Sequence, residues 1–275
     1  MSDAFAAMPN FRDAGGHATA DGGRMRLGFL YRSDQPAGLG PDDEARLASL
    51  GLRTVFDLRT AAEIAMEPGM APAGATRVRL DVLADERDGA PARIISMLSD
   101  PRRASEELGG GRAAAMFSRV YRSLVATPSA IDGYRRFCLG LLDERGAPAL
   151  VHCTTGKDRT GWACAALQSL AGVPRETVYR DFLASTPRIL GKYRTHLAAF
   201  AAAGGDPDVL TPVLGVLPEY LDAAFDEVAA RHGSIESWFA VGLGLGDEAV
   251  EALRARLVAR SGAEAVPGVA ARHRG

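Results

Sequence analysis

The chain has 275 residues, of which 47% are hydrophobic and 24% are charged. A chain of this length buries roughly three quarters of the surface that it exposes when unfolded, and its composition is that of a globular protein, so a disordered or fibrous protein is excluded. The 32 basic and 34 acidic residues give a net charge of −2. This balance argues against attraction of the whole surface to nucleic acid or to an anionic membrane, while a local basic pocket is compatible with it.

Cysteine content and the N-terminal residues predict the compartment. Three cysteines cannot form a disulfide framework in a chain this long, so a reducing environment is expected. The N-terminal residues, MSDAFAAMPNFRDAGG, carry an early acid and no basic segment followed by an apolar one, unlike a Sec-type signal peptide. No apolar run reaches the roughly 18 residues that span a bilayer. We expect a cytoplasmic protein without stable membrane association, with secretion by another route left open.

In chain order, the first half of the sequence predicts strands that alternate with helices. Strands are expected over 28–34, 54–58 and 76–82, the last with one less covered face because Val and Leu alternate with polar residues. A helix is expected over 41–50, with Pro41 at its start, acids in its first turn and Gly51 after its end.

Residues 83–112 differ in character from their surroundings. They are charged, contain two prolines and end in three glycines, with one apolar cluster, Ile94, Ile95, Met97 and Leu98, that suits a short amphipathic helix. Two interpretations stay open, a surface excursion or a mobile cover over a site. No domain boundary is predicted there, so a single domain over residues 1–262 is expected, followed by a flexible tail over 263–275.

Helical periodicity dominates the second half of the chain. Helices are expected over 113–125 and 129–142, a short apolar strand over 149–153, and a helix beginning near Trp162. Beyond Pro174 every predicted element is helical: 174–184, 188–203, 217–232, a short helix near 234–241, and 247–260. The fold class is therefore α/β, with a central, mainly parallel sheet of about four or five strands, flanking helices and a helical C-terminal third.

Between that strand and that helix lies the segment with the clearest chemistry, His152 to Gly161, HCTTGKDRTG. Inward-pointing N–H groups of a tight loop and the start of a helix together form an anion site, and Gly156 allows a backbone conformation that a side chain would forbid. Arg159 lies six residues after Cys153, so a closed loop returns its guanidinium, whose fork matches two phosphate oxygens, toward the sulfur. The same positive field favours a thiolate at Cys153.

Other loop motifs fail on spacing. A nucleoside-triphosphate P-loop requires Ser or Thr after the lysine, whereas Asp158 follows Lys157. A zinc site requires paired ligands, and Cys153 has only His152 beside it, with Cys164 eleven residues on. An isolated cysteine in an apolar strand is usually a core residue, but the surrounding loop favours a nucleophile here.

The H-C-x5-R-[ST] pattern resembles the signature of the cysteine-dependent phosphatases, and HCTTGKDRTG is similar to the loop of their bacterial and fungal tyrosine-phosphatase branch, which includes secreted mycobacterial members. The resemblance extends over roughly residues 5–258 and is weakest over 83–112. It includes the segments 10–16 (NFRDAGG), 30–34 (LYRSD), 55–59 (VFDLR) and 218–243. It implies a tyrosine-phosphatase-like fold and hydrolysis of phosphomonoesters.

The resemblance also implies roles for the loop residues. Cys153 would attack phosphorus and become a phosphocysteine, Arg159 would clamp two phosphate oxygens, and Thr160 would hydrogen-bond the sulfur. His152 would support the cysteine. The remaining loop residues would bind substrate: Thr154, Thr155, Gly156, Lys157 and Gly161. No metal or other cofactor is required, because the arginine and the amides supply the positive field.

Two aspartates compete for the role of general acid. Asp158, inside the loop, is preferred because it lies within reach of a leaving oxygen above the sulfur, and Asp81, at the end of the 76–82 strand, is the alternative. A salt bridge that shapes the loop is the non-catalytic interpretation of either residue.

Further polar and buried residues receive structural interpretations. Arg12 and Asp13 are expected to join the N-terminal element to the core, and Asp57 and Arg59 to form an internal ion pair. Cys164 and Trp162 are expected to pack in the core.

Expected substrates are proteins that carry phosphotyrosine, with a tolerant pocket. Lys157 next to Arg159 gives two cations over one pocket, and in the resembling branch such a lysine accompanies activity on phosphoinositides and on phosphoserine or phosphothreonine. Nucleic acid is not an expected partner, and the sequence makes no prediction of oligomeric state. A silent phosphate-binding module and a sulfurtransferase stay open as alternatives.

Overall fold

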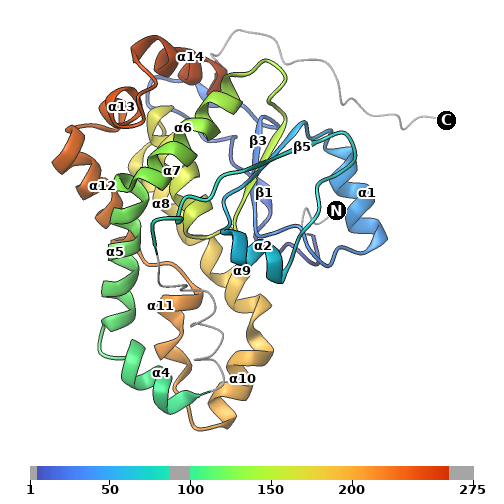
Figure 1. Ribbon diagram of the computed structural model, residues 1–275, viewed down its shortest axis with the longest axis vertical. Coiled ribbons are helices and arrows are strands. Elements are labelled where there is room, and N and C mark those ends of the chain that lie inside the picture. The colour runs from blue at the N-terminus through green and yellow to red at the C-terminus, as the bar shows by residue number, and fades with distance from the viewer. Residues whose placement is uncertain (1–4, 87–99, 260–275) are drawn as a thin grey trace.

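The computed structural model describes residues 5–86 and 100–259, and a mixed β-sheet lies at its centre (Figure 1). The sheet has five strands in the order β1-β3-β6-β4-β5. The four strands from β3 to β5 run parallel, and β1 is antiparallel to β3. This arrangement confirms the predicted α/β class. The strand bounds are β1 Arg12–Asp13, β3 Leu30–Ser33, β4 Thr54–Asp57, β5 Thr76–Arg79 and β6 Ala149–His152.

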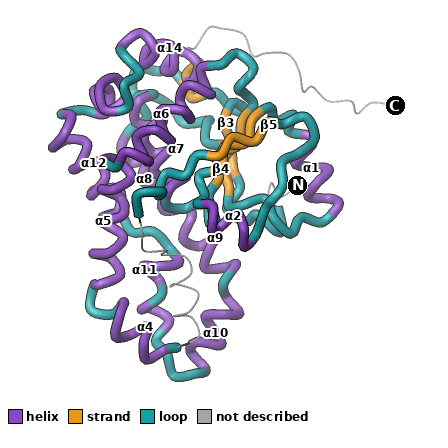
Figure 2. Tube along the Cα trace, viewed as in Figure 1, coloured by secondary structure: helices purple, strands orange, loops and turns teal. Residues whose placement is uncertain are grey.

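Helices make up most of the remaining structure and flank the sheet, most of them on one side and α1 on the other (Figure 2). The helices before strand β6 are α1 Pro41–Ser49, α2 Ala61–Met66, α4 Pro101–Leu108, α5 Arg112–Ala126 and α6 Pro128–Leu142. Those after it are α7 Arg159–Leu170, α8 Arg175–Leu183, α9 Ser185–Lys192, α10 Arg194–Ala202, η1 Pro207–Val209, α11 Thr211–Leu214, α12 Pro218–His232, α13 Ile235–Ser237, the π-helix η2 Trp238–Gly242 and α14 Asp247–Leu257. Among the described helices, none has the length and apolar character to cross a membrane.

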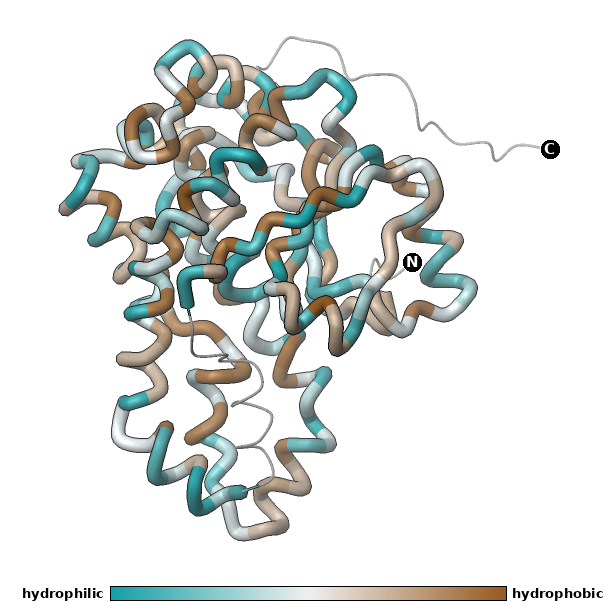
Figure 3. The backbone as a smooth tube through the Cα atoms, viewed as in Figure 1, coloured by the Kyte–Doolittle hydropathy of each residue, from teal (hydrophilic) through white to brown (hydrophobic). Residues whose placement is uncertain are grey.

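Alternation along the strands divides the core into two parts. Val55 and Leu150 point to one face, where they pack with Leu47 of α1 in a small cluster. Phe56 and Val151 point to the opposite face and join the main core, which α5, α6, α7 and the C-terminal helices complete. Hydrophobic residues accordingly recur along the strands and at intervals along the helices that pack on them (Figure 3). Because both faces are covered, the strands β4 and β6 are buried throughout.

The structure corrects several predicted element bounds. The strand predicted over 76–82 ends at Arg79, and as the edge strand β5 it is only half-buried. The helix predicted over 188–203 is two helices, α9 and α10, separated at Tyr193, where the backbone leaves helical geometry. The helix predicted to reach residue 260 ends at Leu257, since Val258–Ala259 forms β7 and pairs with β2 (Arg24–Met25).

Other predictions concern segments that the structure describes only in part. Within 83–112, the structure places helix α4 after Asp100, whose side chain caps it, whereas the apolar cluster over 94–98 lies outside the described residues. The predicted tail over 263–275 also lies outside them. The single domain over residues 1–262 stays a prediction.

Parallel pairing aligns the ends of three strands at one edge of the sheet. Ser33 of β3 and Asp57 of β4 both lie in register with His152, the last residue of β6. Segments that leave these strands therefore meet at the carboxyl edge, where ligands of open α/β sheets bind.

Candidate active site

The loop from Cys153 to Asp158 leaves β6 at this edge and leads directly into α7. Its cysteine is buried, with 1% of its surface exposed. Gly156 has a φ of +65°, and a Cβ atom at this position would lie 2.2 Å from the Ser33 carbonyl oxygen. Only glycine fits both the left-handed conformation and this close approach. The loop is thus curled tightly against the end of β3.

Hydrogen bonds turn the carbonyl groups of the loop outward. The Gln35 N–H donates to the Thr154 oxygen at 3.2 Å, the Asn10 amide to the Thr155 oxygen at 2.9 Å, and Arg32 Nη2 to the Gly156 oxygen at 3.0 Å. Among the described residues, no N–H group from Thr154 to Thr160 donates to a protein acceptor. Such a run of unpaired donors before a helix forms an anion site.

A buried ionic network holds Arg32 in place. Its Nη1 donates to Asp181 Oδ2 at 2.8 Å, and Arg12 donates to Asp181 Oδ1 at 2.7 Å. Arg12 also donates to Ser185 and to both oxygens of Asn10. Burial opposes ionisation of Asp181, but the two arginines outweigh it and hold the pKa of that carboxyl well below its ordinary value. The N-terminal segment, β3 and α8 are thereby linked to the loop, in agreement with the scaffold role expected for Arg12.

Arg159 opens α7 and forms a two-pronged ion pair with Glu63. Its Nη1 and Nη2 donate to the two carboxylate oxygens, each at 2.6 Å, and Thr154 also donates to Glu63. Burial alone would raise the pKa of Glu63, but the hydrogen bonds and charge of Arg159 lower it from 4.5 to about 2. A bidentate pair of this kind fixes the plane of the guanidinium as well as its position.

Glu63 and helix α2 were not predicted from the sequence. The Thr60 hydroxyl accepts from the Glu63 N–H at 3.3 Å, and Glu63 Oε2 accepts from the Thr60 N–H at 2.9 Å. This reciprocal arrangement is a capping box. The segment T-A-A-E over 60–63 carries its sequence signature, which predicts a helix start directly after the 54–58 strand. Glu63 therefore caps its helix and pairs with Arg159.

Lys157 and Asp158 form an ion pair beside helix α5. Lys157 Nζ lies 2.9 Å from Asp158 Oδ1 and 2.7 Å from Oδ2. The same ammonium lies 4.6 Å from the centre of the Phe117 ring, and the lysine is only 3% exposed. Tyr121, one helical turn after Phe117, donates its hydroxyl to Asp158 Oδ1 at 3.1 Å. Neither of these two aromatic residues was predicted from the sequence to lie at the site.

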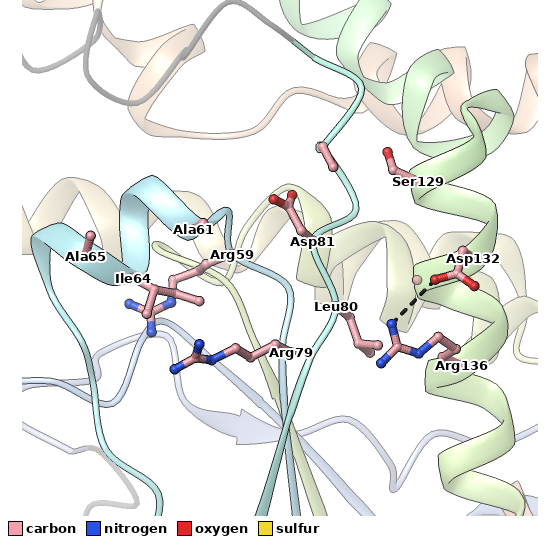
Figure 4. Close-up of a pocket in the computed structure, with 12 residues that line it drawn as sticks. Arg59, Ala61, Ile64, Ala65, Arg79, Leu80, Asp81, Ser129, Asp132 and Arg136 are labelled. Carbon is pink, nitrogen blue, oxygen red and sulfur yellow. Dashed lines mark hydrogen bonds and ion pairs between the residues drawn. The ribbon is translucent and has the colours of Figure 1, made fainter.

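Asp81 lies in the loop after β5, at a cavity of about 600 Å³ between α2 and α6 (Figure 4). Its carboxylate points into the space between Ala61 and Ser129 and accepts a hydrogen bond from the Leu83 N–H at 3.1 Å. Burial raises the pKa of Asp81, with a weaker opposing effect from that N–H. Arg159 and Glu63 are within electrostatic range of Asp81. In the described hydrogen bonds, no loop residue contacts its side chain.

His152 and Asp57 lie behind the loop. The His152 ring bonds through Nδ1 to the Cys153 carbonyl oxygen at 3.1 Å. Burial lowers the pKa of His152 to about 4, so the ring is neutral and Nδ1 is the donor. Asp57 pairs with Arg59 through two hydrogen bonds of 2.9 Å and also binds Arg77, which agrees with the expected internal ion pair. Burial opposes ionisation of Asp57, but the arginines hold its pKa below the ordinary value.

The first turn of α7 contributes buried residues. The Thr160 hydroxyl is fully buried and has no hydrogen-bond partner among the described residues. Gly161 faces Phe182, whose ring would lie 3.0 Å from a Cβ atom. Trp162 packs against Trp238 and Cys164 is a buried free thiol, so both are core residues as expected. Asp13 binds the N–H groups of Gly15 and Gly28 and shapes the N-terminal turn.

Comparison with known proteins gives consistent matches over most of the chain. A family model described as the tyrosine phosphatase family matches residues 4–259. A protein of Cupriavidus necator assigned as a tyrosine-protein phosphatase is 36% identical over 237 residues, which cover 86% of this chain and 81% of that protein. The triple specificity protein phosphatase PtpB of Mycobacterium tuberculosis is 29% identical over 252 residues, which cover 82% of this chain and 88% of that protein.

Proposed function

The chain belongs to the tyrosine phosphatase family, and on that premise we propose that it hydrolyses phosphotyrosine in proteins through a phosphocysteine intermediate on Cys153. Family membership and the names of its relatives support protein phosphatase activity. The observation that carries the mechanism is the loop itself. The loop between the buried Cys153 and Arg159 carries unpaired N–H groups from Thr154 to Thr160. Such a group of donors beside an arginine is a binding site for a doubly charged oxyanion.

In the first step, the Cys153 sulfur attacks phosphorus. The P–S bond forms while the bond from phosphorus to the leaving oxygen breaks, and Asp158 gives its proton to that oxygen. Arg159 and the loop N–H groups bind the phosphoryl oxygens as their charge develops. The bidentate contact with Glu63 supports this role, because it sets the orientation of the guanidinium before substrate arrives.

In the second step, water attacks the phosphocysteine. Asp158 takes a proton from the water, the P–S bond breaks, and the products are inorganic phosphate and the Cys153 thiolate. The unpartnered hydroxyl of Thr160 supports its predicted role as a donor to the departing sulfur. No step in this scheme uses a metal ion.

We base the assignment of Asp158 over Asp81 on their surroundings. Asp158 is a residue of the loop itself and retains 17% exposure of its side chain, whereas Asp81 lies outside the loop and bonds the backbone of Leu83 and of Ala61 in α2. The name of the mycobacterial relative, a triple specificity protein phosphatase, supports a broader specificity, and the predicted activities on phosphoserine, phosphothreonine and phosphoinositides rest on the sequence resemblance. The pairing of Lys157 with Asp158 favours an internal role for that lysine over contact with a second phosphate.

Hydrolysis of p-nitrophenyl phosphate, with and without vanadate, tests the proposal. We expect turnover by the native chain, inhibition by vanadate, and loss of at least about 10³-fold in kcat for Cys153→Ser, because serine is a far poorer nucleophile at neutral pH. Cys138→Ser, another buried cysteine but on α6, is the matched control and should keep its activity. A silent phosphate-binding module or a sulfurtransferase would show no turnover, and unchanged activity in Cys153→Ser would refute the mechanism.

A panel of substrates tests the specificity. We expect higher kcat/KM for phosphotyrosine peptides than for phosphoserine peptides or phosphoinositides. A preference for either of the other two classes would overturn the assignment to phosphotyrosine.

A further inference from the structure

Helix α5 lies beside the catalytic loop and presents two aromatic side chains to it. Phe117 contacts Lys157, and Tyr121 contacts Asp158. Helix α12 packs against α5 (Figure 1), and its Tyr220 stacks on Phe117 and lies 5.5 Å from the Tyr121 ring between centroids. Both tyrosines are fully buried. Phe117 and Tyr121 are therefore packed against both the loop and α12.

The contacts of Asp158 are unequal at its two oxygens. Oδ1 accepts from both the Tyr121 hydroxyl at 3.1 Å and Lys157 Nζ at 2.9 Å, whereas the only described contact of Oδ2 is with Lys157 at 2.7 Å. A general acid must present one oxygen to the leaving group in a fixed direction. The tyrosine holds one oxygen and thereby sets the direction of the other.

Tyr121 is suited to remain a donor throughout the reaction. Burial, followed by the negative charge of Asp158, raises the pKa of Tyr121 well above its ordinary value, so the hydroxyl keeps its proton. The Tyr121 side chain has no exposed surface. It is therefore placed to act on the substrate through Asp158 and not by direct contact.

We propose that Tyr121 is a positioning residue that orients the Asp158 carboxyl for proton transfer to the leaving oxygen, with Lys157 held on Phe117 as the second restraint. This inference rests on the proposed function, in which Asp158 is the general acid. It assigns to the loop lysine and to two α5 residues a role in proton transfer that is separate from phosphate binding.

The test compares two substrates that differ in their need for an acid. Phenyl phosphate has a poor leaving group and depends on protonation, whereas p-nitrophenyl phosphate has a good one and depends on it less. We expect Tyr121→Phe to lower kcat/KM about tenfold for phenyl phosphate and less than about threefold for p-nitrophenyl phosphate. Tyr220→Phe is the matched control, because its hydroxyl donates to the Pro212 carbonyl oxygen and should leave the ratio of the two substrates unchanged.

A double-mutant cycle separates this role from general destabilisation. In the Asp158→Asn background, Tyr121→Phe should have no further effect on either substrate. The inference is overturned if Tyr121→Phe lowers kcat/KM equally for both substrates or leaves both values unchanged. It is also overturned if the effect of Tyr121→Phe adds in full to that of Asp158→Asn. Failure of the proposed function itself is distinguishable, because the native chain would then turn over neither substrate.

Discussion

Replacing Glu63 with Gln tests whether the ion pair with Arg159 is as strong as its geometry implies. Glutamine retains the size of the side chain and is itself accepted in a capping box, so α2 keeps its N-terminal cap. What is lost is the negative charge opposite the guanidinium, together with one of the two hydrogen bonds of 2.6 Å. The substitution therefore changes the ion pair with Arg159 and leaves the cap of helix α2 in place.

The size of the effect follows from the pKa of Glu63, which is lowered from 4.5 to about 2. One pH unit corresponds to about 1.4 kcal/mol, so ionised Glu63 stabilises the fold by about 3 kcal/mol at pH 7. Because the pKa is lower in the folded state, this contribution is complete above the unfolded-state value of 4.5 and is lost as the pH falls toward 2. At pH 3.5 about 2 kcal/mol should remain.

Urea unfolding at pH 7 and at pH 3.5 measures the difference in the free energy of unfolding between the native chain and Glu63→Gln. Contributions from other titrating groups cancel in that difference, since both proteins share them. Glu67→Gln, an exposed position at the end of the same helix, should cost less than about 1 kcal/mol. A difference for Glu63→Gln that is below about 1 kcal/mol at pH 7, or that grows on acidification, would refute the reasoning.

Further predictions concern the loop and its neighbours. Gly156→Ala should lower the free energy of unfolding by more than about 2 kcal/mol and abolish turnover, measured by urea unfolding and hydrolysis of p-nitrophenyl phosphate; a stable, active variant would contradict the close approach to Ser33. The His152 ring should stay neutral in NMR titrations down to about pH 5, because its pKa is lowered to about 4. Since the unfolded chain protonates His152 first, stability should fall as the pH drops from 6.5 toward 4. Asp158→Asn should lose about 100-fold in kcat/KM for phenyl phosphate while Asp81→Asn loses less than about threefold, and the reverse order would make Asp81 the acid.

The sequence predicted the elements whose patterns are local. The apolar runs over 54–58 and 149–153 predicted the buried strands β4 and β6, and the periodicity over 129–142 predicted α6. The chemistry proposed for the loop was likewise inferred from a local pattern, because Cys153, Gly156 and Arg159 are all within seven residues. Each of these signals is complete within one short segment.

Contacts between distant segments were not predictable in the same way. Glu63 lies 96 residues before Arg159, and Tyr121 lies 37 residues before Asp158. Nothing in the pattern of either segment specifies the partner. Two-residue strands such as β1 and β2 are likewise set by pairing and not by propensity. The role of Lys157 was predicted from its charge alone, without the neighbours that neutralise it.

The shape of the loop depends on parts of the chain that meet only when folding is complete. The carbonyl of Thr155 is held by Asn10, and that of Gly156 by Arg32, whose ion pair comes from Asp181. A folding intermediate in which the strands β3 to β6 have paired but the segment around Asn10 has not docked would therefore have secondary structure and no catalytic activity. During refolding, the time at which turnover appears would therefore report when the N-terminal segment docks on the loop.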